Sequence, residues 1–333
     1  MTGTQTPPTP VASEGGAPTR AVARAERFST ALIVGAVAIG VIIAVALTPG
    51  FLTVDNVRAI LRNASIVGIA AVGMTPITLS GNFISLGTQQ SAMAASVVFV
   101  ALVGNGLAPA LAIVIVVVAL LVVGAIQGAV VAAGLNPVIT TLAAGAIIFG
   151  VVADATNGQV VSIGDHPVSW GNGSVAGIPV EVLVFALVTV VVGLLVSGTV
   201  AGREVTLCGA NKETAIASGI SYRRVTLWAF MIFSGALAIA GVLAGAGFGQ
   251  ATIQSLNTLT VDALAAILVG GTAIAGGYGS PWRSAAGALL IAVITNVMIL
   301  NNFSIGGRLA VEGAVVVVVV VLLEFLRRHR EVR

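Results

Sequence analysis

The chain has 333 residues, of which 57% are hydrophobic and only 8% are charged, with a formal net charge of +3. A soluble domain carries about 25% charged residues, so a soluble core of this size would lack the polar groups to cover its surface. The composition therefore excludes a soluble globular protein and predicts an integral membrane protein. The 41 glycines and the low aromatic content fit helices that pack closely through small residues.

Helices rather than a β-barrel are predicted to span the membrane. A barrel strand alternates apolar and polar residues over about ten positions, whereas residues 111–131 and 182–198 form continuous apolar runs. Runs of roughly 20 residues suit α-helices, which satisfy their own backbone hydrogen bonds in lipid. The predicted fold class is all-α, a polytopic membrane protein.

The chain begins with a polar segment. Residues 1–27 are rich in Pro, Thr, Ala and Gly, and they predict a disordered tail rather than a signal peptide. Residues 28–327 form the predicted transmembrane domain, and residues 328–333 form a basic tail. About ten spans are expected, at 28–48, 64–81, 88–104, 107–133, 138–153, 180–200, 225–247, 261–279, 284–302 and 308–326.

The basic residues predict which side of the membrane each loop faces. With ten spans and the N-terminus in the cytoplasm, twelve of the fifteen Lys and Arg residues fall inside, and only Arg58, Arg62 and Arg308 fall outside. Cytoplasmic loops carry an excess of Lys and Arg, so both termini are expected in the cytoplasm. The longest external loop is then 154–179, where Trp170 is a candidate for the membrane interface.

Two segments of the chain resemble each other faintly. A shift of 195 residues lays 69–85 on 264–280, so that Gly81 meets Gly276 and Phe83 meets Tyr278. Gly-interrupted segments in two halves mark the substrate path of many transporters. Apolar helices also match by chance, and the sequence leaves both explanations open.

No catalytic or nucleotide-binding motif is present in the sequence. The only lysine, Lys212, follows CGAN rather than the glycine-rich loop that binds phosphates. The only cysteine, Cys208, has no partner for a disulfide, and the two histidines lie far apart in the sequence. We therefore expect no enzyme activity, no metal site and no cofactor in this chain.

Acidic residues inside the spans would indicate coupling to protons or ions, because such groups are costly in the membrane and are usually functional. The acids nearest the spans, Asp262, Glu312 and Glu324, all lie near a predicted end. Glu312 follows Arg308 by four residues, which predicts an ion pair near the outer surface. The energy source for transport is thus expected on another chain.

Neutral polar residues are more numerous in the spans and could hydrogen-bond an uncharged polar solute. The alternative for each is a bond to a neighbouring helix, worth about 0.6 kcal/mol on average. The candidates for a solute path combine such residues with glycines of the interrupted segments: Asn82, Phe83, Ser85, Gln89, Asn136, Gly270, Gly271 and Gly276.

One segment, residues 202–224, is far more polar than the rest, with six charged residues in 23 positions. Within it, Asn211 is a good N-cap for a helix over 212–218, and Glu213 suits its first turn. Gly209 ends the preceding segment, and Gly219 suits the position after the helix.

This helix of two turns is too short to be stable alone in water, so it must pack on this protein or on a partner. Its small side chains, Ala215, Ala217 and Ser218, would fit a shallow groove together with Ile216. An ordinary helical loop is the alternative.

The segment GREVTLCGANKETAIASGIS resembles the cytoplasmic loop of ribose-type permeases of ABC importers, the branched-chain amino acid and simple-sugar permease family. There the loop reads G-R, then G-x-N-x-x-A-A-x-x-S-G-I, and this chain has Thr214 in place of the first Ala. VDALAAILVGGTAIAGGYGS (261–280) and NPVITTLAAGAIIFGV (136–151) resemble two further motifs of the family. The likeness covers about 55–327.

The resemblance implies a permease subunit that imports a small polar solute, a monosaccharide or related polyol, by alternating access. The loop would be a coupling helix pressed against a separate ABC ATPase, which binds ATP and Mg. Its residues would be Gly209, Asn211, Glu213, Ala215, Ser218 and Gly219.

Further partners implied are a second permease copy or a paralogue, a periplasmic or lipoprotein solute-binding protein, and membrane lipid. No nucleic acid is expected, and the expected location is the bacterial inner or plasma membrane. A self-sufficient facilitator or secondary carrier for a small neutral solute is the alternative function, and a non-transporting scaffold is a third.

The chain departs from the family at one position. Sugar-type members often carry G-G-x-D-L-S-x-G after the second span, whereas this chain reads SGNFISLG (80–87), with Phe83 in place of the acid. A less polar solute, or a heterodimer whose other permease supplies the Asp, would both fit.

Overall fold

The computed structural model describes residues 48–331 apart from 165–167, 169 and 172, together with Gly35 and Ile42, and it describes side chains up to Val318 and at Val321. The predicted tail 1–27 and nearly all of the first predicted span lie outside these residues. The helices are α2 (Val54–Leu79), α3 (Thr88–Gly104), α4 (Pro109–Ala132), α5 (Pro137–Thr156), α6 (Val180–Gly198), α7 (Val200–Ala210), α8 (Lys212–Ala217), α9 (Tyr222–Phe248), α10 (Leu259–Val269), α11 (Pro281–Leu300) and α12 (Ile305–Glu331). The strands are β1 (Val161–Ser162), β2 (Ser174–Val175), β3 (Ile178–Pro179) and β4 (Gln250–Ala251).

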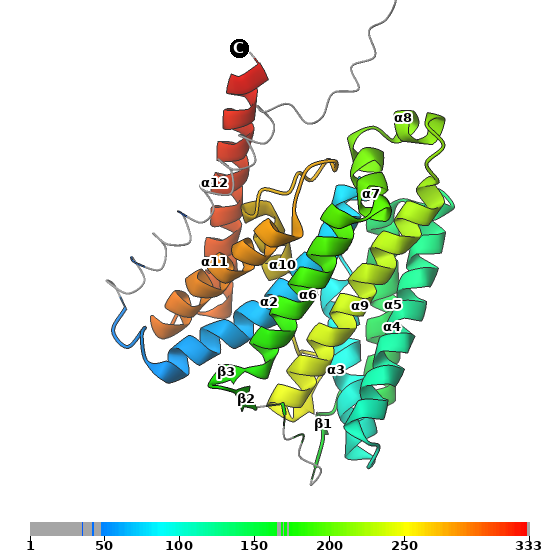
Figure 1. Cartoon of the computed structure of the whole chain (residues 1–333). Coiled ribbons are helices and arrows are strands. Elements are labelled where there is room, and N and C mark those ends of the chain that lie inside the picture. The colour runs from blue at the N-terminus through cyan, green and yellow to red at the C-terminus, as the bar shows by residue number, and fades with distance from the viewer. Residues whose placement is uncertain are drawn as a thin grey trace, which may run out of the picture.

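The described helices form a bundle with two distinct ends. Figure 1 shows α7 and α8 at one end, together with the C-terminal end of α12, and β1, β2 and β3 at the other. We call these the α8 end and the strand end. The connections between long helices therefore alternate between the two ends, as expected of a chain that crosses a membrane repeatedly.

Nine of the ten predicted spans overlap a described helix, and α3 matches its prediction to the residue. Among the described residues, six helices are long and apolar enough to cross a membrane, namely α2, α4, α5, α6, α9 and α11. The exposed faces of α4 and α5 carry large aliphatic side chains such as Val118 and Ile147, which suits contact with lipid. A polytopic helical membrane protein is thus confirmed, whereas the number of ten spans stays a prediction.

The 27-residue helix α9 lies at the centre of the packing and contacts α2, α3 and α4. Its Phe230 and Phe233 are fully buried in the core. Small residues allow close approach elsewhere along α9, since a Cβ at Gly241 would overlap the carbonyl oxygen of Ala92. Close packing of small residues is the usual means of helix association in membranes, where the hydrophobic effect does not drive it.

Two helices of the bundle, α2 and α10, are each followed by a non-helical segment. After α2, residues 80–87 are not helical, and after α10 neither are residues 270–280. The predicted span 261–279 is therefore wrong over its second half. Gly271, two residues after α10 ends, adopts a φ of 73°, and this left-handed conformation terminates an α-helix. Gly276 in the same segment has a φ of 90°.

The strand end departs from the prediction of a purely helical chain. β1 pairs with β4 in antiparallel register, with Val161 opposite Ala251, and β2 pairs with β3. Strands of two residues are too short to show an alternating pattern in the sequence. Trp170, predicted at the membrane interface, packs against Phe99 with ring centroids 6.2 Å apart.

The polar segment also contains one helix more than the single helix predicted for it. The span that begins at residue 180 ends at Gly198, and Thr199 starts α7 because its hydroxyl accepts a hydrogen bond from the backbone N–H of Gly202 at 3.1 Å. A threonine that caps a helix in this way separates α6 from α7.

Candidate functional site

The short helix predicted at 212–218 is present as α8. The side chain of Asn211 caps it, because Oδ1 accepts a hydrogen bond from the N–H of Thr214 at 3.0 Å. Glu213 is exposed in the first turn, and Gly219 ends the helix in the left-handed conformation with φ of 84°. The capping signals in the sequence were therefore interpreted correctly. The preceding helix, α7, ends at Ala210, one residue later than the end predicted at Gly209.

Only part of the predicted small face of α8 is accessible. Ala215 is buried in a cluster with Leu79, Cys208 and Val225, so it packs on this protein's own bundle. Ile216 is half exposed, at 50%, and Ala217 and Ser218 are also exposed. Ala215 therefore anchors α8 to the bundle, and a partner could contact the remaining side.

A chain of polar contacts connects α8 to the broken segment after α2. The ammonium of Lys212 lies 3.8 Å from the ring centroid of Tyr222, the first residue of α9. The hydroxyl of Tyr222 donates a hydrogen bond to Oδ1 of Asn82 at 2.7 Å. The amide of Asn82 in turn donates to the hydroxyls of Ser80 and Thr226 at 2.8 and 3.2 Å. The buried Asn82 is thus fully engaged in this network.

Backbone contacts between glycines join the same elements. A Cβ at Gly209 of α7 would overlap the carbonyl oxygen of Leu79, at the end of α2. A Cβ at Gly276 would lie 2.7 Å from the Cα of Gly81 and 3.2 Å from the Cα of Gly209. The N–H of Gly277 also donates to the carbonyl oxygen of Leu79 at 2.9 Å. The two segments aligned by the shift of 195 residues therefore meet directly, and α7 lies against both.

The other candidates for a solute path occupy different environments. Phe83 is 47% exposed and has an unusual positive φ of 61°, whereas Ser85 is buried. The backbone N–H of Gln89 donates to the hydroxyl of Thr260 at 3.0 Å. Asn136 is exposed and caps α5. The structure thus brings Asn82 and Gly276 to the glycine contact, and leaves Asn136 as a capping residue at the start of another helix.

The two remaining glycines of that set have backbone roles. Gly270 follows α10, where a Cβ would lie 2.6 Å from the carbonyl oxygen of Arg283 in α11. Gly271 then turns the chain through its positive φ. Gly270 thus permits close approach of α11, and Gly271 permits the turn that follows α10.

A cavity of about 580 Å³ lies towards the strand end, between the first half of α2 and the segment from Phe248 to α10. None of the eight path candidates lines it. Its polar residues combine two basic, two acidic and two neutral side chains, so that its formal charges balance. The lining consists of Asp55, Arg58, Ala59, Arg62, Asn63, Ile66, Val67, Phe248, Leu256, Thr258, Leu259 and Asp262.

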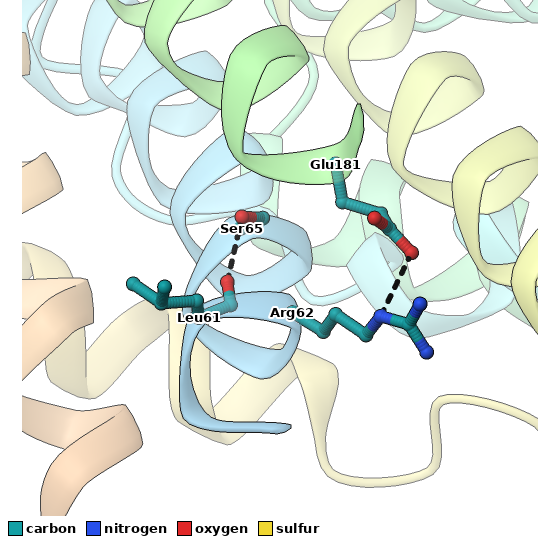
Figure 2. Close-up of polar contacts among 4 residues, drawn as sticks. All are labelled: Leu61, Arg62, Ser65 and Glu181. Carbon is teal, nitrogen blue, oxygen red and sulfur yellow. Dashed lines mark hydrogen bonds and ion pairs between the residues drawn. The ribbon is translucent and has the colours of Figure 1, made fainter. Parts of the chain in front are cut away.

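An ion pair connects this cavity wall to α6. Figure 2 shows Arg62 of α2 extending towards Glu181, with Nε 3.4 Å from Oε1. The carboxyl group of Glu181 is buried. In the same turn of α2 as Arg62, the hydroxyl of Ser65 donates a hydrogen bond to the carbonyl oxygen of Leu61 at 2.7 Å. The sequence interpretation missed Glu181, although it is the only acid in an apolar stretch of about twenty residues. That isolation was the available signal.

The expected ion pair between Arg308 and Glu312 is not formed. Glu312 is buried at 2% exposure, and its Oε1 accepts a hydrogen bond from the hydroxyl of Thr295 at 2.8 Å. Asp262 is also buried, at 4%, with Oδ2 accepting from Thr258 at 2.8 Å. Asp262 lies in the first turn of α10, near a helix end as expected, but both it and Glu312 are buried, whereas the side chain of Glu324 lies outside those described.

The fold and this arrangement define a polytopic membrane protein whose short, exposed helix is connected to the non-helical segments that follow α2 and α10. The chain belongs to the family described as branched-chain amino acid transport system / permease component, whose model matches residues 56–324. The family resemblance seen in the sequence is therefore confirmed.

Several curated permeases are similar to the chain over most of their length. It is 30% identical to the ribose import permease of Haemophilus influenzae, over 84% of this chain and 88% of that protein. Identity is also 30% to the fructose import permease of Bifidobacterium longum, over 76% and 72%, and to the D-allose transport system permease of Escherichia coli, over 82% and 84%. No solved structure matches the chain.

Membership of the family defines the kind of subunit. The chain is a multi-pass membrane permease of a bacterial ABC importer and is not itself an enzyme. The ATP-binding site of such an importer lies on a partner ATPase, and a solute-binding protein is the second kind of partner.

Proposed function

We propose that this permease imports a small neutral polyhydroxylated solute, a monosaccharide or a related polyol, by alternating access. The relatives named for ribose, fructose and D-allose support this class of solute. The balanced charge of the cavity lining supports it too, since a neutral solute needs no net charge opposite it. Side chains that donate and accept hydrogen bonds on the cavity wall suit hydroxyl groups, which do both.

The observation that carries the mechanism is the connection from α8 to the broken segments. Lys212, Tyr222 and Asn82 form one polar chain, and Gly209 and Gly276 add direct backbone contact. A displacement of α8 by a closing ATPase would therefore reach residues 80–87 and 270–280 without a flexible intermediate. We propose that these two segments open and close the solute path.

The proposed orientation follows from the basic residues. The α8 end faces the cytoplasm and the ATPase, and the strand end, with its cavity, faces the solute-binding protein. The exposed side of α8, including Ile216 and Ala217, would enter a groove of the ATPase together with Asn211, Glu213, Ser218 and Gly219. The pore would form between two permeases, as a homodimer or with a paralogue that supplies an acid opposite Phe83.

Uptake by purified components tests the proposal. Proteoliposomes would contain the permease and the ATPase encoded beside it, with the neighbouring solute-binding protein and radiolabelled D-ribose supplied outside. We expect uptake that requires ATP inside and all three components. Equal uptake by liposomes that contain the permease alone would contradict the proposal and favour a self-sufficient facilitator.

A further inference from the structure

Two buried carboxyl groups, Asp262 in α10 and Glu312 in α12, lie within hydrogen-bonding reach of each other. One oxygen of each is already engaged by a threonine hydroxyl at 2.8 Å, Oδ2 of Asp262 by Thr258 and Oε1 of Glu312 by Thr295. The other oxygens, Oδ1 and Oε2, are buried and have no hydrogen-bond partner among the described residues. Carboxylate oxygens left in this state are costly and call for an explanation.

The charged groups around Asp262 and Glu312 can balance one negative charge on the pair. Arg308 of α12 acts electrostatically on Asp262, but neither carboxyl forms an ion pair within the described chain. From α2, Asp55, Arg58 and Arg62 face the cavity that Asp262 also lines, and Arg62 pairs with Glu181 of α6. Of the other neighbours of α10, α3 contains no charged residue, and α11 contributes Thr295, whereas its buried Arg283 contacts the opposite end of α10.

Two ionised carboxylates at this separation would repel each other, and adjacent carboxyl groups avoid this by sharing one proton. We propose that Asp262 and Glu312 form a proton-binding site, in which one proton is held between Oδ1 of Asp262 and Oε2 of Glu312. The proton is bonded to one carboxyl and donated to the other, so both orphaned oxygens are satisfied and the pair carries a single negative charge near Arg308. The site joins α10 to α12 only while the proton is bound.

The cavity gives this site access to the solution. Asp262 and Thr258 line it, so water that enters the cavity at the strand end reaches Asp262 without crossing the bundle. The α10–α12 contact would therefore respond to the pH at that end. This property is independent of the solute and of the ATPase, and it extends beyond the proposed import function.

Infrared spectroscopy of the purified full-length permease in lipid nanodiscs tests the site without any transport assay. We expect the wild-type protein at neutral pH to show a carbonyl stretching band of a protonated carboxyl group that shifts in D₂O. Asp262→Asn and Glu312→Gln should each abolish the band, since the partner then ionises and accepts from the amide. Glu181→Gln is the matched control and should leave the band intact, because Glu181 is a buried acid that pairs with Arg62 and lies outside the proposed site.

Thr295→Val provides a second test that keeps both acids. Loss of the hydroxyl that donates to Glu312 should shift the frequency of the band without removing it. Absence of the band in the wild type, its persistence in both acid variants, or its loss in Glu181→Gln would overturn the proposal. Replacement of the band by ionised carboxylate on addition of sodium chloride at constant pH would also overturn it, since the site would then bind a metal cation.

Discussion

The hydroxyl of Tyr222 donates a hydrogen bond to Oδ1 of Asn82 at 2.7 Å, and this bond connects the start of α9 to the broken segment after α2. Tyr222 also lies beneath the ammonium of Lys212 in α8. One side chain thus touches both the helix proposed to meet the ATPase and the segment proposed to open the path. If the connection transmits movement, weakening it should separate ATP hydrolysis from uptake.

Tyr222→Phe removes the hydroxyl and keeps the ring under Lys212. We expect a loss of about 0.5–1.5 kcal/mol of stability, with uptake reduced more than ATP hydrolysis in proteoliposomes. Tyr222→Leu, which also removes the ring, should reduce both the stability and the uptake further, because a cation–π contact contributes about 0.5–1 kcal/mol at exposed sites. Wild-type uptake in Tyr222→Phe would show that the bond does not transmit movement.

Gly209→Ala should disturb the contact between α7 and the end of α2. The new Cβ overlaps the carbonyl oxygen of Leu79, and backbone cannot move aside as a side chain can, so we expect a loss of about 1–3 kcal/mol. Gly198→Ala is the matched control, since a Cβ there meets nothing within 4 Å. Thermal unfolding of the purified variants measures the difference. Equal midpoints for the two would contradict the close contact.

Phe83 adopts a left-handed backbone that disfavours bulky residues, with φ of 61°. Phe83→Asn places a residue that tolerates this conformation, and the half-exposed ring loses little packing. We expect the variant to be more stable by about 0.5–1 kcal/mol, measured by its unfolding midpoint, with a changed order of preference among competing solutes. A lower midpoint would show that the ring of Phe83 makes contacts that outweigh the strain.

Burial raises the pKa of the Cys208 thiol, with Glu204 acting in the same direction and Lys212 opposing it. A raised pKa leaves less of the reactive thiolate at neutral pH. Labelling by a maleimide should therefore be slow in the folded permease, increase with pH, and become fast on unfolding. Lys212→Ala should slow it further by removing the opposing influence. Because Cys208 is the only cysteine, mass spectrometry measures the rate without background. Labelling at the unfolded rate would contradict its burial.

Much of this fold could be predicted from the sequence, because a continuous apolar run can satisfy its own backbone hydrogen bonds in lipid only as a helix. The caps at Asn211 and Gly219 could also be predicted from the sequence. An Asn side chain can accept a hydrogen bond from a free backbone N–H at the start of a helix, and Gly readily adopts the left-handed conformation that ends one. The break after Val269 could not be predicted, because the glycines at 270–277 are apolar by composition and extend the hydrophobic run. The positive φ of Gly271, rather than its hydropathy, ends the helix.

The site was less predictable, because it depends on contacts between distant residues. Tyr222 and Asn82 are hydrogen-bonded although they lie 140 residues apart in the sequence. The only signal for Tyr222 was that the chain contains just two tyrosines. The burial of Glu312 depends on Thr295 and on the position of α10, whereas the spacing to Arg308 pointed to a surface ion pair. Local spacing predicts a local pair, and packing between helices overrides it.

The central claim is that α8 is the surface through which a separate ATPase drives the permease. Co-purification of the permease with its ATPase from detergent-solubilised membranes tests this most directly, using Ala217→Arg in α8 and Ala108→Arg before α4 as a matched control at an exposed site in the connection from α3 to α4. We predict that Ala217→Arg enters the membrane at wild-type levels and loses the ATPase, whereas Ala108→Arg retains it. Retention of the ATPase by Ala217→Arg at the level of the control would contradict the account.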